Sequence, residues 1–330
     1  MLRLGIIGTN WITHQFVQAA LETKKYELTA VYSRKLAKAE EFGQKYDAPV
    51  TYSTDLDEFF SLDDIDVVYI ASPNSLHFSQ ARQAIENGKH VIVEKPAFST
   101  PAEMHEIVTA AQEKQLFFFE AARNIHEESF AKIKEILPAP EHIIGANFTY
   151  MKYSSRYDLV LKGEEPNIFS PHFSAGSLAD LGVYVVYAAL GWFGRPKEVH
   201  HFAHKIRTGV DGFGIVILRY DHFDVTLQHG KIGDSQLPSE IYFDDGTLWL
   251  DAVNAISRAH LTRRSEETSI DLDISVKENP MTEEAADFAR VIENDDQQQY
   301  QEWLELALNV NQVLFQLRQE AGIVYDADKK

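Results

Sequence analysis

The sequence lacks cysteine, long hydrophobic runs and an excess of positive charge. Zero cysteines exclude disulfides, thiolate-bound zinc, iron–sulfur clusters and a cysteine nucleophile. The 31 Lys and Arg residues stand against 50 Asp and Glu residues, a net charge of −19, so we expect no nucleic-acid partner. The longest apolar stretch, residues 183–193, is far shorter than the ~20 residues that cross a bilayer, and no signal peptide is recognisable. We therefore expect a cytoplasmic protein without a membrane partner.

What is present indicates two domains. The chain has 330 residues, of which 45% are hydrophobic, enough to bury more than one core. Residues 1–122 alternate short β-branched runs, such as 2–7 and 66–71, with longer amphipathic segments such as 11–22. Strands that alternate with helices in this way form parallel sheets, because each helix carries the chain back across the sheet. This part therefore predicts an α/β domain.

Residues 123–330 have a different pattern. From about residue 141 alternating strands follow one another through short turns, which predicts a mostly antiparallel sheet in an α+β domain. A helix is expected over residues 176–193, and two more close the chain. The loop of residues 154–175 has no regular pattern. Loops of this length are often functional, so it either shapes a binding pocket or packs against itself as a lid.

The turn after the first strand could bind a pyrophosphate. Glycine there lets the backbone approach a phosphate, and the amides at a helix N-terminus attract it. Only the first glycine of the Gly-x-Gly-x-x-Gly pattern is present, because Asn10 and Thr13 replace the other two. The pattern therefore leaves two readings open, a nucleotide-binding turn and an ordinary tight turn. The sequence of this turn is Gly8, Thr9, Asn10, Trp11, Ile12 and Thr13.

The end of the second strand indicates which dinucleotide would fit. An acidic residue at this place binds a ribose 2′-hydroxyl, whereas cations can pair with a 2′-phosphate. This chain has Ser33 and Arg34, with Lys38 one turn later, and no acid. A hydroxyl with two cations suits NADP(H). The alternative is that these residues are only the solvated start of a helix and bind no ligand.

Two further segments follow the carboxyl ends of parallel strands, the edge where open α/β sheets bind ligands. One runs Ala71-Ser72-Pro73-Asn74-Ser75-Leu76-His77, and the other runs Glu94-Lys95-Pro96. A lysine at the end of a short buried strand points toward the ligand crevice, so Lys95 is the best catalytic candidate. The alternative is a lysine that only neutralises Glu94.

In the second domain, Asp180 and Tyr184 lie four residues apart on the predicted helix and so share one face. A tyrosine can donate a proton to a developing alkoxide, although a helical tyrosine is more often a packed aromatic.

No metal site is expected. His200, His201 and His204 lie along an apparent strand, which places the first and last ~13 Å apart and turns the middle one to the other face.

These motifs occur together and in order, and the whole chain closely resembles the Gfo/Idh/MocA family, named for glucose-fructose oxidoreductase, inositol dehydrogenase and rhizopine catabolism. The resemblance is carried by Gly5-Ile6-Ile7-Gly8, Ser72 through His77, Glu94-Lys95-Pro96 and Gly176 through Tyr184. It implies an N-terminal Rossmann domain that binds NAD(P) and a C-terminal domain with an open sheet. It also implies a homodimer or homotetramer, because that sheet commonly pairs subunits.

The resemblance implies a role for several residues. Lys95 would be catalytic near the nicotinamide, Asn74 and His77 would form part of the cofactor wall, and Asp180 would belong to the substrate pocket. Tyr184 stands where much of the family has a histidine, which resembles the glucose-fructose oxidoreductase and dihydrodiol dehydrogenase branches. The predicted cofactor-binding residues are Gly8, Thr9, Asn10, Trp11, Ile12, Ser33, Arg34, Lys38, Ala71, Ser72, Pro73, Asn74, His77, Glu94, Lys95 and Arg123.

The sequence thus predicts an NAD(P)-dependent oxidoreductase, with NADP favoured and NAD possible. It would move hydride between the nicotinamide and a secondary alcohol or carbonyl carbon of a sugar-like or cyclic diol substrate. The alternative is a sensor or corepressor of the same fold that binds dinucleotide without catalysis. The joint presence of Lys95, Asp180 and Tyr184 favours the enzyme.

Overall fold

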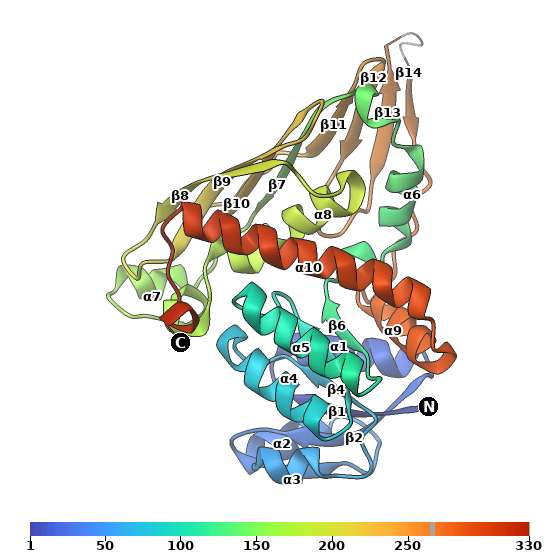
Figure 1. The fold of residues 1–330 in the computed structure, drawn as a ribbon, viewed down its shortest axis with the longest axis vertical. Coiled ribbons are helices and arrows are strands. Elements are labelled where there is room, and N and C mark those ends of the chain that lie inside the picture. Colours follow the sequence, from blue (N-terminus) through green and yellow to red (C-terminus); the bar gives the residue numbers. More distant parts are fainter. Residues whose placement is uncertain (265–267, 330) are drawn as a thin grey trace. The chain divides into compact units, whose positions relative to one another are not determined.

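The computed structural model describes residues 1–264 and 268–329, and the chain forms two compact units (Figure 1). The first comprises Met1–Arg123 and Lys277–Ala307, and the second comprises Asn124–Val276 and Leu308–Lys330. The sequence predicts that all residues after 122 belong to the second domain, whereas residues 277–307 belong to the first unit. Those residues return to the first unit because their aromatic side chains pack on its sheet.

The first unit is built on a parallel sheet with the strand order β3-β2-β1-β4-β5-β6. Each pair in it is parallel, and β1 has β2 on one side and β4 on the other. This is the doubly wound Rossmann order, which reverses direction between β1 and β4 and binds dinucleotides at that point. The α/β prediction is confirmed. The strands are β1 (Leu2–Ile7), β2 (Tyr26–Tyr32), β3 (Thr51–Ser53), β4 (Val67–Ile70), β5 (His90–Glu94) and β6 (Phe118–Ala121).

The helices of the first unit follow from their caps and apolar faces. Thr100 caps the N-terminus of α5 by accepting a hydrogen bond from the amide of Glu103, and Pro101 occupies the first helical position. In the returning segment, Phe288 of α9 stacks on Phe119 of β6 at 4.7 Å between ring centroids. The helices are α1 (Trp11–Glu22), α2 (Leu36–Gly43), α3 (Leu56–Phe60), α4 (His77–Glu86), α5 (Pro101–Glu113) and α9 (Thr282–Asn294), with α10 (Gln297–Glu320) contributing to both units.

The second unit is built on a sheet with the strand order β14-β13-β12-β11-β7-β10-β9-β8. Every pair is antiparallel except β7 and β10, which run parallel. The predicted mostly antiparallel sheet is therefore confirmed. The strands are β7 (Ile143–Met151), β8 (Glu198–Lys205), β9 (Asp211–Arg219), β10 (Asp224–Gly230), β11 (Ser239–Phe243), β12 (Gly246–Leu250), β13 (Ala259–Arg263) and β14 (Thr268–Asp271).

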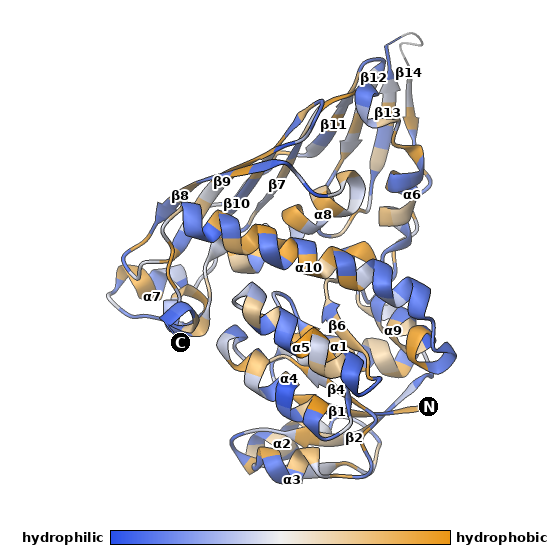
Figure 2. Ribbon diagram, viewed as in Figure 1, coloured by the Kyte–Doolittle hydropathy of each residue, from blue (hydrophilic) through white to orange (hydrophobic). Residues whose placement is uncertain are grey.

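The two faces of this sheet differ. Helix α8 (Val183–Phe193) lies against β7 and β10, and Figure 2 shows it to be largely hydrophobic. The strand residues on that inner face are fully buried, among them Val216, Leu218, Val225 and Leu227. Residues on the outer face are only partly covered: Phe202 is 67% exposed, and Ile215, Ile217 and Trp249 are half-buried.

One helical stretch of the described residues, Pro171–Phe193, is long and apolar enough to cross a membrane. However, 89% of its most apolar part is buried inside the protein, as in the core helix of a globular fold. Length and composition alone are weak evidence for a membrane span, and the burial indicates that this segment forms part of the protein core.

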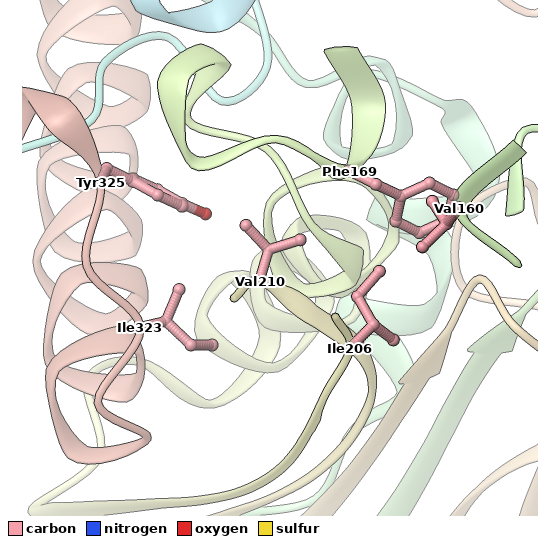
Figure 3. Packing of buried hydrophobic residues seen from close by; sticks show 6 residues of the cluster. All are labelled: Val160, Phe169, Ile206, Val210, Ile323 and Tyr325. Atoms are coloured by element: carbon pink, nitrogen blue, oxygen red, sulfur yellow. The ribbon is translucent and has the colours of Figure 1, made fainter. Parts of the chain in front are cut away.

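The expected loop of residues 154–175 has its own core. It contains α7 (Tyr157–Leu161), and two of its side chains, Val160 and Phe169, are buried in a cluster with Ile206, Val210, Ile323 and Tyr325 (Figure 3). Burial of this apolar surface holds the segment against the sheet and the C-terminal residues. The two side chains thus pack against residues outside the loop and not only within it, and a role for the loop in shaping a binding pocket stays a prediction.

Candidate active site

In the first unit, the turn after β1 passes close to the end of β4. Gly8 has a positive φ of 108°, and a Cβ atom built on it would lie 2.8 Å from the backbone oxygen of Ala71. A side chain at this position would collide with backbone, so only glycine fits. Trp11 is 73% exposed beside this turn.

Asn10 explains how the turn manages without its second and third glycines. Its side-chain oxygen accepts hydrogen bonds from the amides of Ile12 and Thr13 at 3.1 and 3.2 Å, which makes it the N-cap of α1. Its amide nitrogen donates to the oxygen of Ala71 at 3.2 Å. The side chain therefore occupies two of the amides at the N-terminus of α1 and ties the turn to the end of β4, and pyrophosphate binding at this turn stays a prediction.

The predicted ribose-binding residues follow β2 at the surface. Arg34 is exposed, and Ser33 is partly so. Lys38 forms an ion pair with Glu41 at 2.6 Å, which leaves Arg34 as the better cation for a 2′-phosphate. An exposed pair of this kind is weak and can exchange with a ligand.

His77 ties together the two loops at the ends of β4 and β5. Its Nε2 lies 2.8 Å from the backbone oxygen of Ser72, and its Nδ1 lies 3.1 Å from that of Ala97. The ring is completely buried, and burial lowers the pKa of His77. The structure therefore buries His77 between the two loops, which its hydrogen bonds hold together, and its place in the cofactor wall stays a prediction.

Lys95 follows β5 on one of these loops and is partly exposed, with a cis peptide bond to Pro96. Its neighbour Glu94 is buried and accepts a hydrogen bond from the hydroxyl of Tyr69 at 2.5 Å. Burial raises the pKa of Glu94, and the charge of Lys95 opposes this shift. Glu94 therefore supports the strand end from inside, and the lysine is the exposed member of the pair.

The predicted cofactor residues that come together in the first unit thus belong to the ends of β1, β2, β4 and β5, and their contact with a dinucleotide stays a prediction. Arg123 lies at the last position of the unit's first segment, and its charge opposes the rise that burial causes in the pKa of Glu94.

In the second unit, the helix that carries Asp180 and Tyr184 begins with a π-helical turn, Leu178–Gly182, which continues into α8. Turns of this type are rare and often occur at functional sites. The sequence predicted the helix but not this turn. The ring of Tyr184 packs edge-on against Tyr150 of β7 at 5.7 Å.

Asp180 forms an ion pair with Lys231, which follows β10. The side chain of Lys231 is only 6% exposed, whereas that of Asp180 is 31% exposed. The cation is therefore inside and holds a carboxylate that reaches the surface of the unit.

A second buried group holds the start of the π-helical turn. Asp211, at the first position of β9, accepts a hydrogen bond from the amide of Leu178 at 2.6 Å and is completely buried. Burial raises the pKa of Asp211 to about 6. Gly176 has φ of 137°, and a Cβ there would lie 2.4 Å from the Oδ1 atom of Asp211. Glycine is therefore required where the chain approaches the carboxylate.

Two buried histidines extend this group. His229 Nδ1 lies 2.9 Å from the Ser177 hydroxyl, and its Nε2 lies 3.1 Å from Nε2 of His201. His201 Nδ1 lies 3.2 Å from the backbone oxygen of Leu317, so it must donate there. In the neutral state His201 Nε2 then accepts from His229, and His229 accepts from Ser177. Burial lowers the pKa of both histidines, which favours these neutral forms.

Ligand atoms of His201, Asp211 and His229 lie within 4.8 Å of one another, close enough to consider a metal. Each ring nitrogen already has a hydrogen-bond partner, and Asp211 caps the turn at Leu178. These contacts give each residue a role without an ion, and the expectation of no metal stays a prediction. That prediction rests on the spacing of His200, His201 and His204, whereas this group joins three strands.

Sequence reasoning missed Lys231, Asp211 and His229. Lys231 directly follows a strand, as Lys95 does, but that strand alternates in burial and does not carry the buried parallel pattern that marked Lys95. No local pattern identifies the other two, since their partners lie 33 and 52 residues away.

Comparison with known proteins places the chain in a family. A family model described as "Oxidoreductase family, NAD-binding Rossmann fold" matches residues 2–122. The scyllo-inositol 2-dehydrogenase (NADP(+)) IolU of Bacillus subtilis is 39% identical over 333 residues, with 100% of both chains covered. A trans-1,2-dihydrobenzene-1,2-diol dehydrogenase of Danio rerio is 26% identical and covers 75% of this chain and 73% of its own.

A solved structure shows the same fold. KijD10, a 3-ketoreductase from Actinomadura kijaniata in complex with NADP and TDP-benzene, superposes with a TM-score of 0.84 at 21% identity, covering 98% of this chain and 99% of its own. Its likeness supports the fold alone. The 39% identity to IolU over the full length of both chains shows the family, and the predicted resemblance is confirmed. The chain belongs to the Gfo/Idh/MocA family and is an NAD(P)-dependent oxidoreductase.

Proposed function

We propose that this enzyme uses NADP(H) to move hydride to or from a ring carbon that bears a secondary alcohol, in a sugar-like or cyclic polyol substrate. The observation that carries the proposal is the 39% identity, over the full length of both chains, to a relative named scyllo-inositol 2-dehydrogenase (NADP(+)). A diol dehydrogenase among the relatives has a substrate of the same class, a ring with vicinal hydroxyls.

The preference for NADP rests on the residues after β2. Arg34 is exposed there with Ser33 beside it, and no carboxylate follows the strand to accept a 2′-hydroxyl. A guanidinium pairs with a phosphate through two parallel hydrogen bonds. The dinucleotide would lie with its pyrophosphate at the turn from Gly8 to Trp11, and its nicotinamide supplies or accepts the hydride when it is bound.

The chemical roles fall to Lys95, Tyr184 and Asp180. In the direction of reduction, the Tyr184 hydroxyl donates a proton to the nascent alkoxide, and the Lys95 ammonium stabilises the negative charge on the same oxygen. Asp180 holds a substrate hydroxyl or orients Lys95. In the direction of oxidation the proton returns to the tyrosine.

Two variants test these roles. Lys95→Met and Tyr184→Phe should each bind NADPH as the wild type does, measured by the fluorescence of the exposed Trp11, and lose most of their turnover with a cyclic polyol. Lys134→Met and Tyr153→Phe are matched controls, because both side chains are exposed elsewhere in the second unit, and both variants should keep full activity. Full activity in Lys95→Met or Tyr184→Phe would remove that residue from the mechanism.

The non-catalytic sensor predicts a different result. Wild-type protein that binds NADPH tightly, yet turns over no cyclic polyol, sugar or diol with either nucleotide, would favour the sensor over the enzyme.

The proposal includes a homodimer or homotetramer in the cytoplasm. The outer face of the second unit's sheet carries Phe202, 67% exposed, beside the half-buried Ile215 and Ile217. Apolar side chains gathered on one sheet face are typical of an interface. Light scattering should give a mass of two or four chains, and Phe202→Glu should lower it. A wild-type monomer would contradict this part of the proposal.

A further inference from the structure

Lys231 lies where its backbone cannot easily move. Its amide donates to the oxygen of Gly212 at 2.8 Å, and its own oxygen accepts from the amide of Ser154 at 2.9 Å. The preceding residue, Gly230, accepts from the amide of Lys152. The Cα of Lys231 is therefore fixed between the start of β9 and the segment after β7.

The side chain of Lys231 is buried together with its charge, since the whole residue is only 5% exposed. A lysine in this setting must have a charged or strongly polar partner, because burial of an isolated ammonium is costly. Its partner is Asp180. The lysine side chain is only 6% exposed, whereas the aspartate side chain is 31% exposed. The lysine therefore supports the carboxylate from below, while the carboxylate remains able to reach a ligand.

The same strand also holds the backbone around Asp180. His229, two residues before Lys231 and on the same face of β10, accepts from the hydroxyl of Ser177. Gly182 leaves room for its ring, because a Cβ there would lie 3.2 Å from the imidazole. The π-helical turn is thus held at its start through Ser177 and at Asp180 through Lys231.

We propose that Lys231 is a positioning residue of the oxidoreductase reaction, which acts through Asp180 by fixing the direction of its carboxylate toward the substrate. The inference rests on the proposed role of Asp180 and assigns Lys231 no contact with substrate or cofactor. A carboxylate on a helix can adopt several rotamers, and a misplacement of about 1 Å in an active site can lower the rate by about 100-fold. A buried cation on a rigid strand end selects one rotamer.

A double-mutant cycle separates this role from a general effect on the fold. Four proteins are compared, the wild type, Lys231→Met, Asp180→Asn and the double variant, and kcat, KM and NADPH affinity are measured for each. Lys231→Met should lower kcat/KM by about 10- to 100-fold, and the double variant should be no worse than Asp180→Asn alone. NADPH affinity should be unchanged, because the residues proposed to bind its phosphates belong to the first unit.

A conservative variant provides the second arm. Lys231→Arg keeps the charge and a stem of similar length, so it should recover most of the activity that Lys231→Met loses. Lys134→Met, at an exposed lysine of the same unit, should behave as the wild type.

The outcomes distinguish the two levels of the argument. An Asp180→Asn variant with full activity would refute the proposed role of Asp180, and this inference with it. An impaired Asp180→Asn variant beside a fully active Lys231→Met variant would overturn the role of Lys231 alone. Losses that multiply in the double variant would also overturn the role of Lys231, because Lys231 would then act independently of Asp180. No recovery of activity in Lys231→Arg would overturn it as well, because the positive charge would then not be what holds the carboxylate.

Discussion

Replacing Asp211 with asparagine tests how the buried carboxyl sets the pH dependence of stability. Asp211 is fully buried, and burial raises its pKa from 3.8 to about 6. Since the folded protein then holds this proton more tightly than the unfolded chain does, the free energy of unfolding falls as the pH rises from about 4 to about 6. About two pKa units at 1.36 kcal/mol each correspond to roughly 3 kcal/mol.

Asparagine keeps an oxygen that can accept from the amide of Leu178 but removes the titration. The wild type minus Asp211→Asn difference in unfolding free energy should therefore decrease by about 3 kcal/mol between pH 4 and pH 7. Urea denaturation at a series of pH values gives this difference, and the titration of the buried histidines largely cancels in it. A Trp11→Phe, Trp303→Phe background restricts the fluorescence signal to the second unit, because the remaining tryptophans belong to it.

Asp224→Asn is a matched control with the opposite sign. A hydrogen bond from Arg219 lowers the pKa of Asp224, so its contribution to stability is present at neutral pH and is lost as the pH falls. The effect should be small, because solvent screens this exposed pair. A difference for Asp211→Asn that stays flat, or that increases with pH, would show that the folded protein does not hold the proton of the buried carboxyl more tightly than the unfolded chain does.

Two further predictions concern the cofactor and the backbone. Arg34→Ala should weaken NADPH binding by about 10- to 100-fold and change NADH binding little. Lys38→Ala, at a lysine already paired with Glu41, should change the binding of both nucleotides little. Fluorescence titration measures each affinity, and equal losses of NADPH and NADH binding in Arg34→Ala would contradict the assignment of Arg34 to the 2′-phosphate. Gly176→Ala should destabilise the fold by about 2–4 kcal/mol, because its Cβ meets the Asp211 carboxylate in addition to the strain of a positive φ. Gly163→Ala should cost only about 1 kcal/mol, because its φ is also positive but no atom lies within 4 Å of the added Cβ. Equal losses in urea denaturation would mean that the carboxylate moves aside.

Much of the fold could be predicted because periodicity reports burial. The strands around 2–7 and 66–71 are apolar because the parallel sheet buries both of its faces, and this pattern gave their class and order along the chain. Two short elements, β3 and α3, were missed because three and five residues are too few to show a period. The return of residues 277–307 to the first unit was also missed, since it depends on contacts such as that between Phe119 and Phe288.

The site was predictable where position along an element determines exposure, and not where distant residues meet. Lys95 was found because a lysine at the end of a buried parallel strand lies at the ligand edge. Asn10 was identified as a departure from the glycine pattern, but its use as a helix cap needed the structure. Lys231 meets Asp180 across 51 residues, and the π-helical turn that presents Asp180 has no signature in the sequence.

Whether the chain is an NADP-dependent oxidoreductase of cyclic polyols can be decided by measuring the absorbance of reduced nicotinamide in mixtures of the enzyme, scyllo-inositol and either NADP⁺ or NAD⁺. We expect steady formation of reduced nicotinamide, with the higher kcat/KM for NADP⁺. If scyllo-inositol proves inactive, the same assay with other cyclic polyols and vicinal diols extends the test. Tight NADPH binding without turnover of any of these substrates would contradict the proposed oxidoreductase activity on cyclic polyols.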